Sequence, residues 1–294
     1  MSAEPTILLG VGATKAGTTW LYNHLRGHPD CHIRAIKELH YFDTVEDGGW
    51  QRQLKVQRRY LAVIAGHKAR GAAKADVSLR RQGDVREWIN LLKGRAEDVP
   101  EYLAYLGNGR GDRRLLADIT PSYALLPEAR LRAMAGMAAD VRFLYLLRDP
   151  VSRLWSNLRM MAARAGAVAA GVQDAARALL DRILDGEPSG AVDRGDYAGA
   201  IERLRAAVAP HRLLMAFQET VQTAPGLARL CAFLGIRTVA ADFASPVLTG
   251  VPAEMTPAQV VRVRAFLAPQ YACVAQQFPD LPAAWRRNMG KGVA

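Results

Sequence analysis

The chain has 294 residues, of which 50% are hydrophobic and 23% charged, and its formal net charge is +11. This is the composition of a globular protein with one large core or two modest ones. No run of 18 apolar residues occurs, which argues against a membrane span. The start does not resemble a signal peptide, and Cys31, Cys231 and Cys273 are too far apart for a disulfide framework or a metal cluster. We therefore expect a cytoplasmic protein without a bound metal.

Positive charge is concentrated between residues 50 and 95. This range holds twelve Lys or Arg residues and three acids, which is nearly all of the excess in the chain. Such a field attracts anions such as nucleotides, acidic glycans, nucleic acid or lipid headgroups. A solvated, arginine-rich surface without a ligand fits the pattern equally well.

The chain begins with a predicted strand, loop and helix. Residues 6–13 form an apolar run that ends in a glycine turn, which is typical of a buried strand. Residues 18–27 predict a helix that Pro29 prevents from continuing. Residues 31–35 predict a short second strand.

Residues 44–112 are the least regular part of the sequence. Glycines and basic residues separate short predicted helices at about 50–65, 84–93 and 98–106. We interpret the segment as a basic, irregular helical insertion over the core. The prediction is a single domain that spans residues 1–294.

Strands and helices alternate regularly after this segment. The predicted strands are 114–118, 141–147 and 212–217, and the predicted helices follow Pro127 and Asp149 and cover about 172–185, 196–208, 225–234 and 256–268. Asp149 is the expected N-cap of its helix, with Pro150 in the first turn. This alternation favours an α/β, P-loop-like three-layer fold with a central, mostly parallel sheet flanked by helices.

The loop from Gly12 to Thr19 has the pattern of a phosphate cradle. It follows a strand and opens a helix, so backbone N–H groups and the helix N-terminus can face an anion. The spacing nearly matches the Walker A motif, but Thr18 stands where that motif has lysine, and the lysine lies inside the loop at position 15. An ordinary glycine turn is the alternative interpretation.

The stretch from Gly10 to Asp30 resembles the loop that binds the 5′-phosphosulfate in sulfotransferases dependent on 3′-phosphoadenosine 5′-phosphosulfate (PAPS). It is most similar to the heparan-sulfate-type and related bacterial branch. The resemblance recurs in order at Lys37–Asp43, Asp118–Tyr123, Leu147–Pro150 with Ser156, and Phe233–Ile236. Several motifs in the right order are more specific than any one of them.

This resemblance implies a PAPS site with two anchors. The loop would contribute Lys15, Ala16, Gly17, Thr18, Thr19 and Trp20. Arg148 at a strand end and Ser156 two turns into the next helix would hold the 3′-phosphate, because a cation and a hydroxyl suit that group. Alternatively, Arg148 pairs with Asp149 and Ser156 is a surface residue. Tyr197 is placed near the nucleotide by the resemblance, or is simply the first core residue of its helix.

The reaction implied is sulfuryl transfer to a hydroxyl or amine, without a metal. Lys15 would neutralise charge on the leaving oxygen. The resemblance favours Glu38 as the general base, with His40 beside it as second candidate, and alternate residues of an extended segment face the same side. A salt bridge for Glu38 and a core position for His40 are the structural alternatives.

Two departures affect the expected acceptor. Asp118 and Ile119 stand where heparan-type enzymes often have Glu and Lys, and residues 246–251 lack the usual basic residues of a loop that closes over the nucleotide. A small molecule, lipid or simpler glycan is therefore favoured, and no nucleic acid is expected. The competing functions are a P-loop kinase or nucleotide hydrolase, with Asp118 as magnesium ligand, and a non-enzymatic polyanion-binding protein.

Overall fold

The computed structural model describes residues 4–66, 72–166, 168, 171–243 and 250–289. Its centre is a five-stranded sheet in the order β2-β3-β1-β4-β5. The strands are β1 Thr6–Gly12, β2 Cys31–His32, β3 Leu115–Asp118, β4 Val141–Leu147 and β5 Leu213–Phe217. All four strand pairs are parallel. The predicted α/β fold with a parallel sheet is confirmed.

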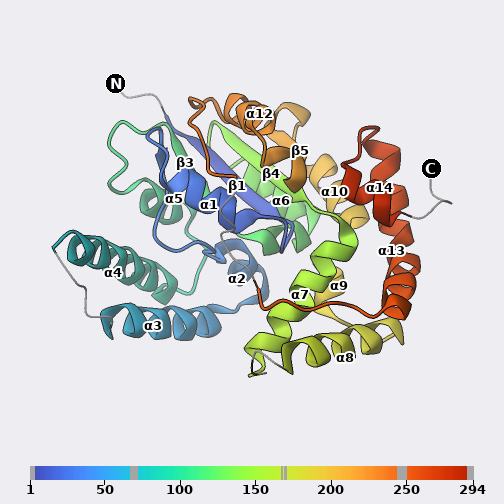
Figure 1. The fold of residues 1–294 in the computed structure, drawn as a ribbon. Coiled ribbons are helices and arrows are strands. Elements are labelled where there is room, and N and C mark those ends of the chain that lie inside the picture. The colour runs from blue at the N-terminus through green and yellow to red at the C-terminus, as the bar shows by residue number, and fades with distance from the viewer. Residues whose placement is uncertain (1–3, 67–71, 167, 169–170, 244–249, 290–294) are drawn as a thin grey trace.

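Helices cover both faces of this sheet (Figure 1). Helices α1 Thr18–Arg26 and α12 Ala224–Leu234 lie in front, and α6 Glu128–Ala135 and α10 Tyr197–Ala207 lie behind. The central strand β1 is buried along nearly its whole length, which explains why its sequence is a continuous apolar run and not an alternating one.

Three further helices form a layer beside the carboxyl edge of the sheet. They are α7 Pro150–Arg164, α8 Val172–Leu184 and α13 Pro257–Gln277. The side chain of Asp149 accepts a hydrogen bond from the Ser152 N–H, so the predicted N-cap of α7 is confirmed. Helix α13 is longer than predicted and continues through Pro269, because Tyr271 and Val274 beyond it are buried in the core.

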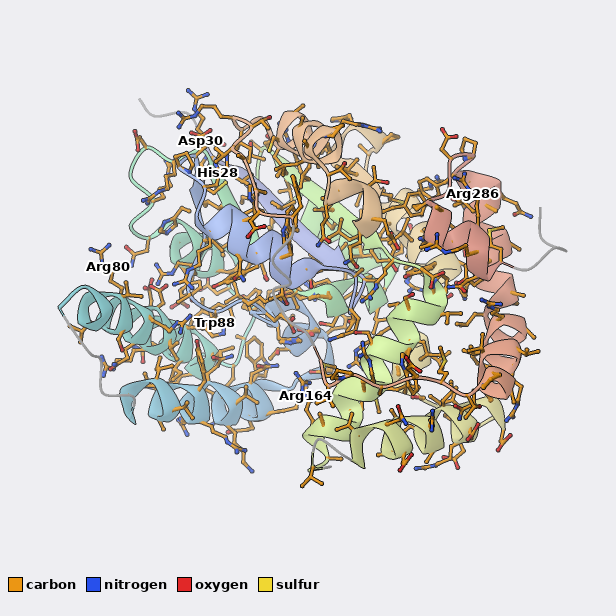
Figure 2. All side chains as sticks on the ribbon, viewed as in Figure 1. His28, Asp30, Arg80, Trp88, Arg164 and Arg286 are labelled. Atoms are coloured by element: carbon orange, nitrogen blue, oxygen red, sulfur yellow. The ribbon has the colours of Figure 1, made fainter. Side chains whose placement is uncertain are left out.

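Two of the short helices predicted within residues 44–112, at about 50–65 and 98–106, are observed nearly as predicted, and the described part of residues 41–107 forms four helices in all. They are α2 Tyr41–Asp47, α3 Trp50–Gly66, α4 Ala72–Lys93 and α5 Val99–Gly107. Helix α4 begins twelve residues before its predicted start, despite the glycine at position 83. Val85, Trp88 and Leu92 of this helix are buried, and Trp88 faces the rest of the molecule (Figure 2). Burial of this stripe outweighs the weak helix propensity of the glycine.

The remaining elements are short. They are η1 Pro121–Leu125, α9 Gly190–Asp193, η3 Pro210–Arg212, α11 Gln218–Val221 and α14 Ala283–Asn288. Within the described ranges, no helix has both the length and the apolar character needed to cross a membrane.

Candidate active site

The carboxyl ends of the parallel strands bring the predicted site residues to one edge of the sheet. The loop of residues 13–17 follows β1, and Arg148 follows β4. Residues 119–122 follow β3, and the pair Gln218 and Glu219 follows β5. In open α/β sheets this edge is where ligands bind.

The loop after β1 turns sharply at two residues with positive φ. Lys15 has φ 72° and Gly17 has φ 84°. A Cβ atom at position 17 would lie 2.9 Å from Cγ of Gln218, so the close packing of these segments requires glycine there. Helix α1 starts at the next residue and directs its free N–H groups into the loop.

The other predicted loop residues differ in exposure. Ala16 and Thr18 are buried, whereas Thr19 is half-buried. Trp20 lies under the segment that follows α12: its Nε1 is 3.4 Å from the carbonyl oxygen of Asp242, and its ring stacks against Phe243. That segment continues into residues 244–249, so most of the predicted closing loop lies outside the described residues.

Several cations converge on the phosphate loop. Lys15 extends toward α7, where its Nζ lies 3.8 Å from Sδ of Met160. Burial lowers the pKa of Lys15, and the charges of Arg148, Arg164 and Arg159 lower it further. Arg164 lies at the end of α7 next to α8 (Figure 2). Mutual repulsion of this kind is relieved by an anion, so the loop is suited to bind one.

Arg148 is tied to both the loop and the core. Its Nη1 donates to the carbonyl oxygen of Lys15 at 2.9 Å. The hydroxyl of Tyr197 donates to the carbonyl oxygen of Arg148 at 2.6 Å and accepts from its N–H at 3.2 Å. Tyr197 is fully buried, so in this structure it holds Arg148 in position and does not face an open site. Ser156 is half-buried on α7, one turn before Arg159.

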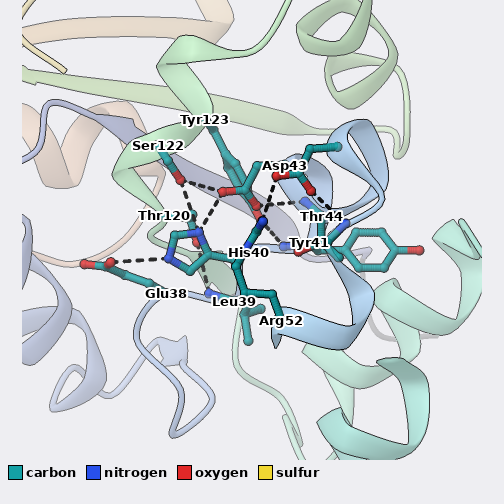
Figure 3. A network of polar contacts seen from close by, with 12 residues as sticks. Glu38, Leu39, His40, Tyr41, Asp43, Thr44, Arg52, Thr120, Ser122 and Tyr123 are labelled. Carbon is teal, nitrogen blue, oxygen red and sulfur yellow. Dashed lines mark hydrogen bonds and ion pairs between the residues drawn. The ribbon is translucent and has the colours of Figure 1, made fainter. Parts of the chain in front are cut away.

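Glu38, His40 and Asp43 form a charged row near this edge (Figure 3). Nδ1 of His40 lies 2.7 Å from Oδ2 of Asp43, and its Nε2 lies 3.6 Å from Oε2 of Glu38. The ammonium group of Lys37 pairs with the other oxygen of Glu38. The hydroxyl of Ser122 donates to Asp43 at 2.8 Å. The imidazole is therefore held between two carboxylates.

This row fixes the charge of both candidate bases. Burial opposes ionisation of Glu38, but the hydrogen bond from His40 and the charge of Lys37 outweigh it and lower the pKa of Glu38 to about 2. Burial also opposes the charge on His40, but its contacts with Asp43 and Glu38 raise its pKa to about 9. At neutral pH the row thus holds two carboxylates around an imidazolium.

A buried hydrogen-bond network supports the row from below. The hydroxyl of Thr120 accepts from the N–H of Leu39 at 3.0 Å and donates to Asp118 at 2.6 Å. The same carboxylate accepts from the hydroxyls of Tyr123 and Tyr102, at 2.8 and 2.9 Å. Asp118 is 1% exposed. It is committed to these hydroxyls and is not placed as the magnesium ligand that the kinase alternative requires.

Comparison with known proteins identifies the family of this chain. The sequence profile of the sulfotransferase family matches residues 8–240, which is most of the chain. The chain belongs to the sulfotransferase family. As a sulfotransferase it is an enzyme that transfers a sulfuryl group. None of the curated proteins matches the chain.

Solved structures include three that resemble this sulfotransferase. A sulfotransferase from Alicyclobacillus acidocaldarius is 23% identical, with a TM-score of 0.62 over 97% of this chain and 100% of its own, which shows a shared fold. The sulfotransferase domain of the Synechococcus PCC 7002 olefin synthase is 19% identical, with a TM-score of 0.46 over 96% of this chain and 97% of its own. The sulfotransferase domain from the curacin biosynthetic pathway is 16% identical, with a TM-score of 0.45 over 98% of this chain and 97% of its own.

The sequence did not single out four polar residues of this sulfotransferase that lie at the site. Asp43 is three residues after His40, a spacing that places both on one side of a helical turn. Ser122 lies within the Asp118–Tyr123 motif, which was recognised without assigning a role to Ser122. Gln218 and Glu219 follow an apolar strand, and that position at a strand end was the available signal. No group of three or more described His, Cys, Asp or Glu residues is arranged to hold a metal ion.

Proposed function

We propose that this sulfotransferase uses PAPS as donor and transfers its sulfuryl group to a hydroxyl or amine of the acceptor. The observation that carries the proposal is the link between two cationic anchors: the guanidinium of Arg148 is hydrogen-bonded to the backbone of Lys15. A donor with phosphate groups at both its 3′ and 5′ positions needs two such anchors close together.

In this proposal the phosphate loop binds one end of the donor, and Arg148 and α7 bind the other end. The N–H groups of Gly17, Thr18 and Thr19 at the start of α1 bind the 5′-phosphosulfate, together with Lys15. Arg148 and Ser156 bind the 3′-phosphate. Ala16 and Trp20 shape the loop, and Tyr197 acts on the donor through Arg148, because its buried hydroxyl already binds that residue.

Donor chemistry requires little from the protein beyond positioning and charge. PAPS supplies an activated sulfuryl group on a phosphate leaving group. The acceptor oxygen or nitrogen forms a new bond to sulfur while the bond from sulfur to the phosphate oxygen breaks. The ammonium of Lys15 neutralises the charge that develops on that oxygen, and Glu38 accepts the proton that the acceptor loses.

Charge favours Glu38 over His40 as the base. At neutral pH the carboxylate of Glu38 is ready to accept a proton, whereas the raised pKa of His40, about 9, leaves its imidazole protonated. We therefore assign His40 and Asp43 to orienting Glu38. A carboxylate with a low pKa is a weak base, so its contribution depends on alignment with the acceptor.

The first test is a radiolabelled-sulfate transfer screen with PAPS across phenols, alcohols, amines, glycans and lipids. Lys15→Ala should abolish transfer, and Arg148→Ala should weaken binding of 3′,5′-adenosine bisphosphate (PAP), measured by calorimetry. An unchanged PAP affinity in Arg148→Ala would show that the 3′-phosphate is held elsewhere. Turnover of ATP that requires Mg²⁺, with no effect of PAPS, would favour the kinase alternative.

A separate control addresses binding of polyanions without catalysis. That alternative predicts heparin binding that weakens steeply with salt and survives loss of Lys15.

We propose that residues 44–112 are an insertion in a single domain and that this insertion shapes the acceptor side of the site. The Lys37–Asp43 segment supports placing this sulfotransferase near the heparan-type branch of the family. Asp118 and Ile119, in contrast, favour an acceptor smaller than a sulfated polysaccharide.

A further inference from the structure

A pocket outside the donor site lies where α1, α3 and α4 face one another. Its volume is about 380 Å³, which is within the range of small-molecule sites. The lining comes from α1, the segment before Glu38, α3 and α4, and consists of Tyr22, Ala35, Ile36, Lys37, Val56, Gln57, Tyr60 and Arg81. Figure 1 shows α3 and α4 side by side, with α1 nearer the sheet.

The walls of this pocket are mostly apolar. Ile36 and Ala35 present buried surface on one side, and Val56 and Tyr60 of α3 stand on the other. The hydroxyl of Tyr22 is occupied, because it donates to the carbonyl oxygens of Arg34 and Ala35 at 3.0 Å each. Tyr22 can therefore offer only the apolar part of its ring. A ligand for this pocket needs an apolar body.

Two polar residues of the lining each have a buried side-chain atom without a partner in the described part of the chain. Nε of Arg81 and Oε1 of Gln57 are buried, and neither has a hydrogen-bond partner among the described residues. No described carboxylate forms an ion pair with Arg81. A buried donor is costly without a partner, so Arg81 is suited to an acidic group. Oε1 of Gln57 is an acceptor and would pair with an N–H or O–H group of a ligand.

One lining residue of the pocket contacts the proposed base. Lys37 lines the pocket, and its ammonium group pairs with Glu38. Glu38 is not itself in the lining, so Lys37 links the pocket to the proposed base. A molecule in the pocket can contact Arg81 and lie next to the residue that pairs with Glu38.

A second hollow of similar size has the opposite charge. It measures about 490 Å³ and lies between α4 and α5, lined in part by Glu87 and Glu101. It contains no lysine or arginine in its lining and none of the predicted site residues. An acidic ligand is disfavoured there by like charge.

We propose that the pocket between α1, α3 and α4 is the acceptor subsite, and that the acceptor is an amphipathic acid. Its apolar body packs against Ile36, Val56 and Tyr60. Its carboxylate or other acidic group pairs with Arg81, and its hydroxyl or amine faces Glu38. The proposal rests on the sulfotransferase function proposed above and names the class of substrate for it.

Binding can be tested without knowing the acceptor. The probe is anilinonaphthalene sulfonate, an apolar anion whose fluorescence rises on binding, titrated with saturating PAP to fill the donor site. Arg81→Gln should raise its Kd about tenfold, because a charge-assisted contact is lost. Val56→Glu should raise it at least as much. Val56 is 51% exposed, so this change places an acid at the pocket without disturbing the core.

Val63→Glu is the matched control for this titration. Val63 lies two turns further along α3, is 50% exposed and does not line the pocket. The control should bind the probe as the wild type does. Equal Kd values for Arg81→Gln, Val56→Glu and the wild type, with PAP binding retained in all three, would overturn the subsite.

Activity gives an independent readout. Phenolic carboxylic acids and their methyl esters should be compared as acceptors with PAPS. We expect the acids to have about tenfold higher kcat/KM, and Arg81→Gln to remove this preference. Equal transfer to acids and esters refutes the subsite and leaves the sulfotransferase proposal intact. Absence of both PAP binding and transfer refutes the underlying function instead.

Discussion

The Asp43→Asn variant separates the two candidate bases by opposite effects on rate. Asp43 makes the shortest contact of His40, at 2.7 Å, and that hydrogen bond is the main cause that raises the pKa of His40. Asparagine keeps the shape of the side chain and removes its charge. The pKa of His40 should therefore fall from about 9 toward its ordinary value.

The size of the effect follows from the charge state of His40. With a pKa of about 9, about 1% of His40 is neutral at about pH 7. If His40 were the base, Asp43→Asn would raise this fraction and increase the rate by about tenfold or more. If Glu38 is the base, the variant loses the anchor that orients it, and the rate should fall about tenfold to a hundredfold.

The assay is the pH dependence of kcat/KM for sulfate transfer, using the best acceptor from the screen. With Glu38 as base, the wild-type profile should be flat from about pH 6 to about pH 8, because the carboxylate is ionised throughout. With His40 as base, it should rise about tenfold per pH unit in the same range. A rising wild-type profile, together with a faster Asp43→Asn enzyme near neutrality, would refute the assignment of Glu38.

The remaining predictions concern packing and positioning. Tyr197→Phe leaves two backbone groups of Arg148 without a partner, so the free energy of unfolding should fall by about 1–3 kcal/mol in urea titrations, with weaker PAP binding by calorimetry. Gly226→Ala would place a Cβ atom 1.9 Å from a backbone carbonyl oxygen and should cost about 3 kcal/mol or more. Gly83→Ala is its control: a Cβ there meets nothing within 4 Å, so the change should stabilise the helix by up to about 1 kcal/mol. Equal thermal unfolding of the two glycine variants would contradict this packing argument.

Local sequence patterns determined the central elements of the fold. The strand β4 was predicted at 141–147 and is observed at Val141–Leu147, because a run with six of its seven positions buried leaves few alternatives to a strand covered on both faces. The N-cap at Asp149 was also predictable, since capping depends on neighbours in the chain. The phosphate loop was recognisable because its residues are also neighbours in the chain.

Helix lengths away from the sheet were not predictable in this way. Helix α4 extends back to residue 72 and α13 continues past Pro269, although glycine and proline argue against both. Their stability depends on residues such as Trp88 and Tyr271, which are buried against distant parts of the chain. Helix propensity summed over a short stretch of sequence does not include the free energy of this tertiary packing.

The sequence by itself determined the family and the residue types of the site: Lys15 in its loop, Arg148 at a strand end, and Glu38 two residues before His40. Only the tertiary structure decided what these residues do to one another. It brought Asp43 and Ser122 to the imidazole and fixed its charge, and it placed Tyr197 behind Arg148. It also set Arg81 in the lining of a mostly apolar pocket together with Lys37, which pairs with the proposed base. Electrostatic effects depend on the distance between charges and on their burial, and the order of the residues specifies neither quantity.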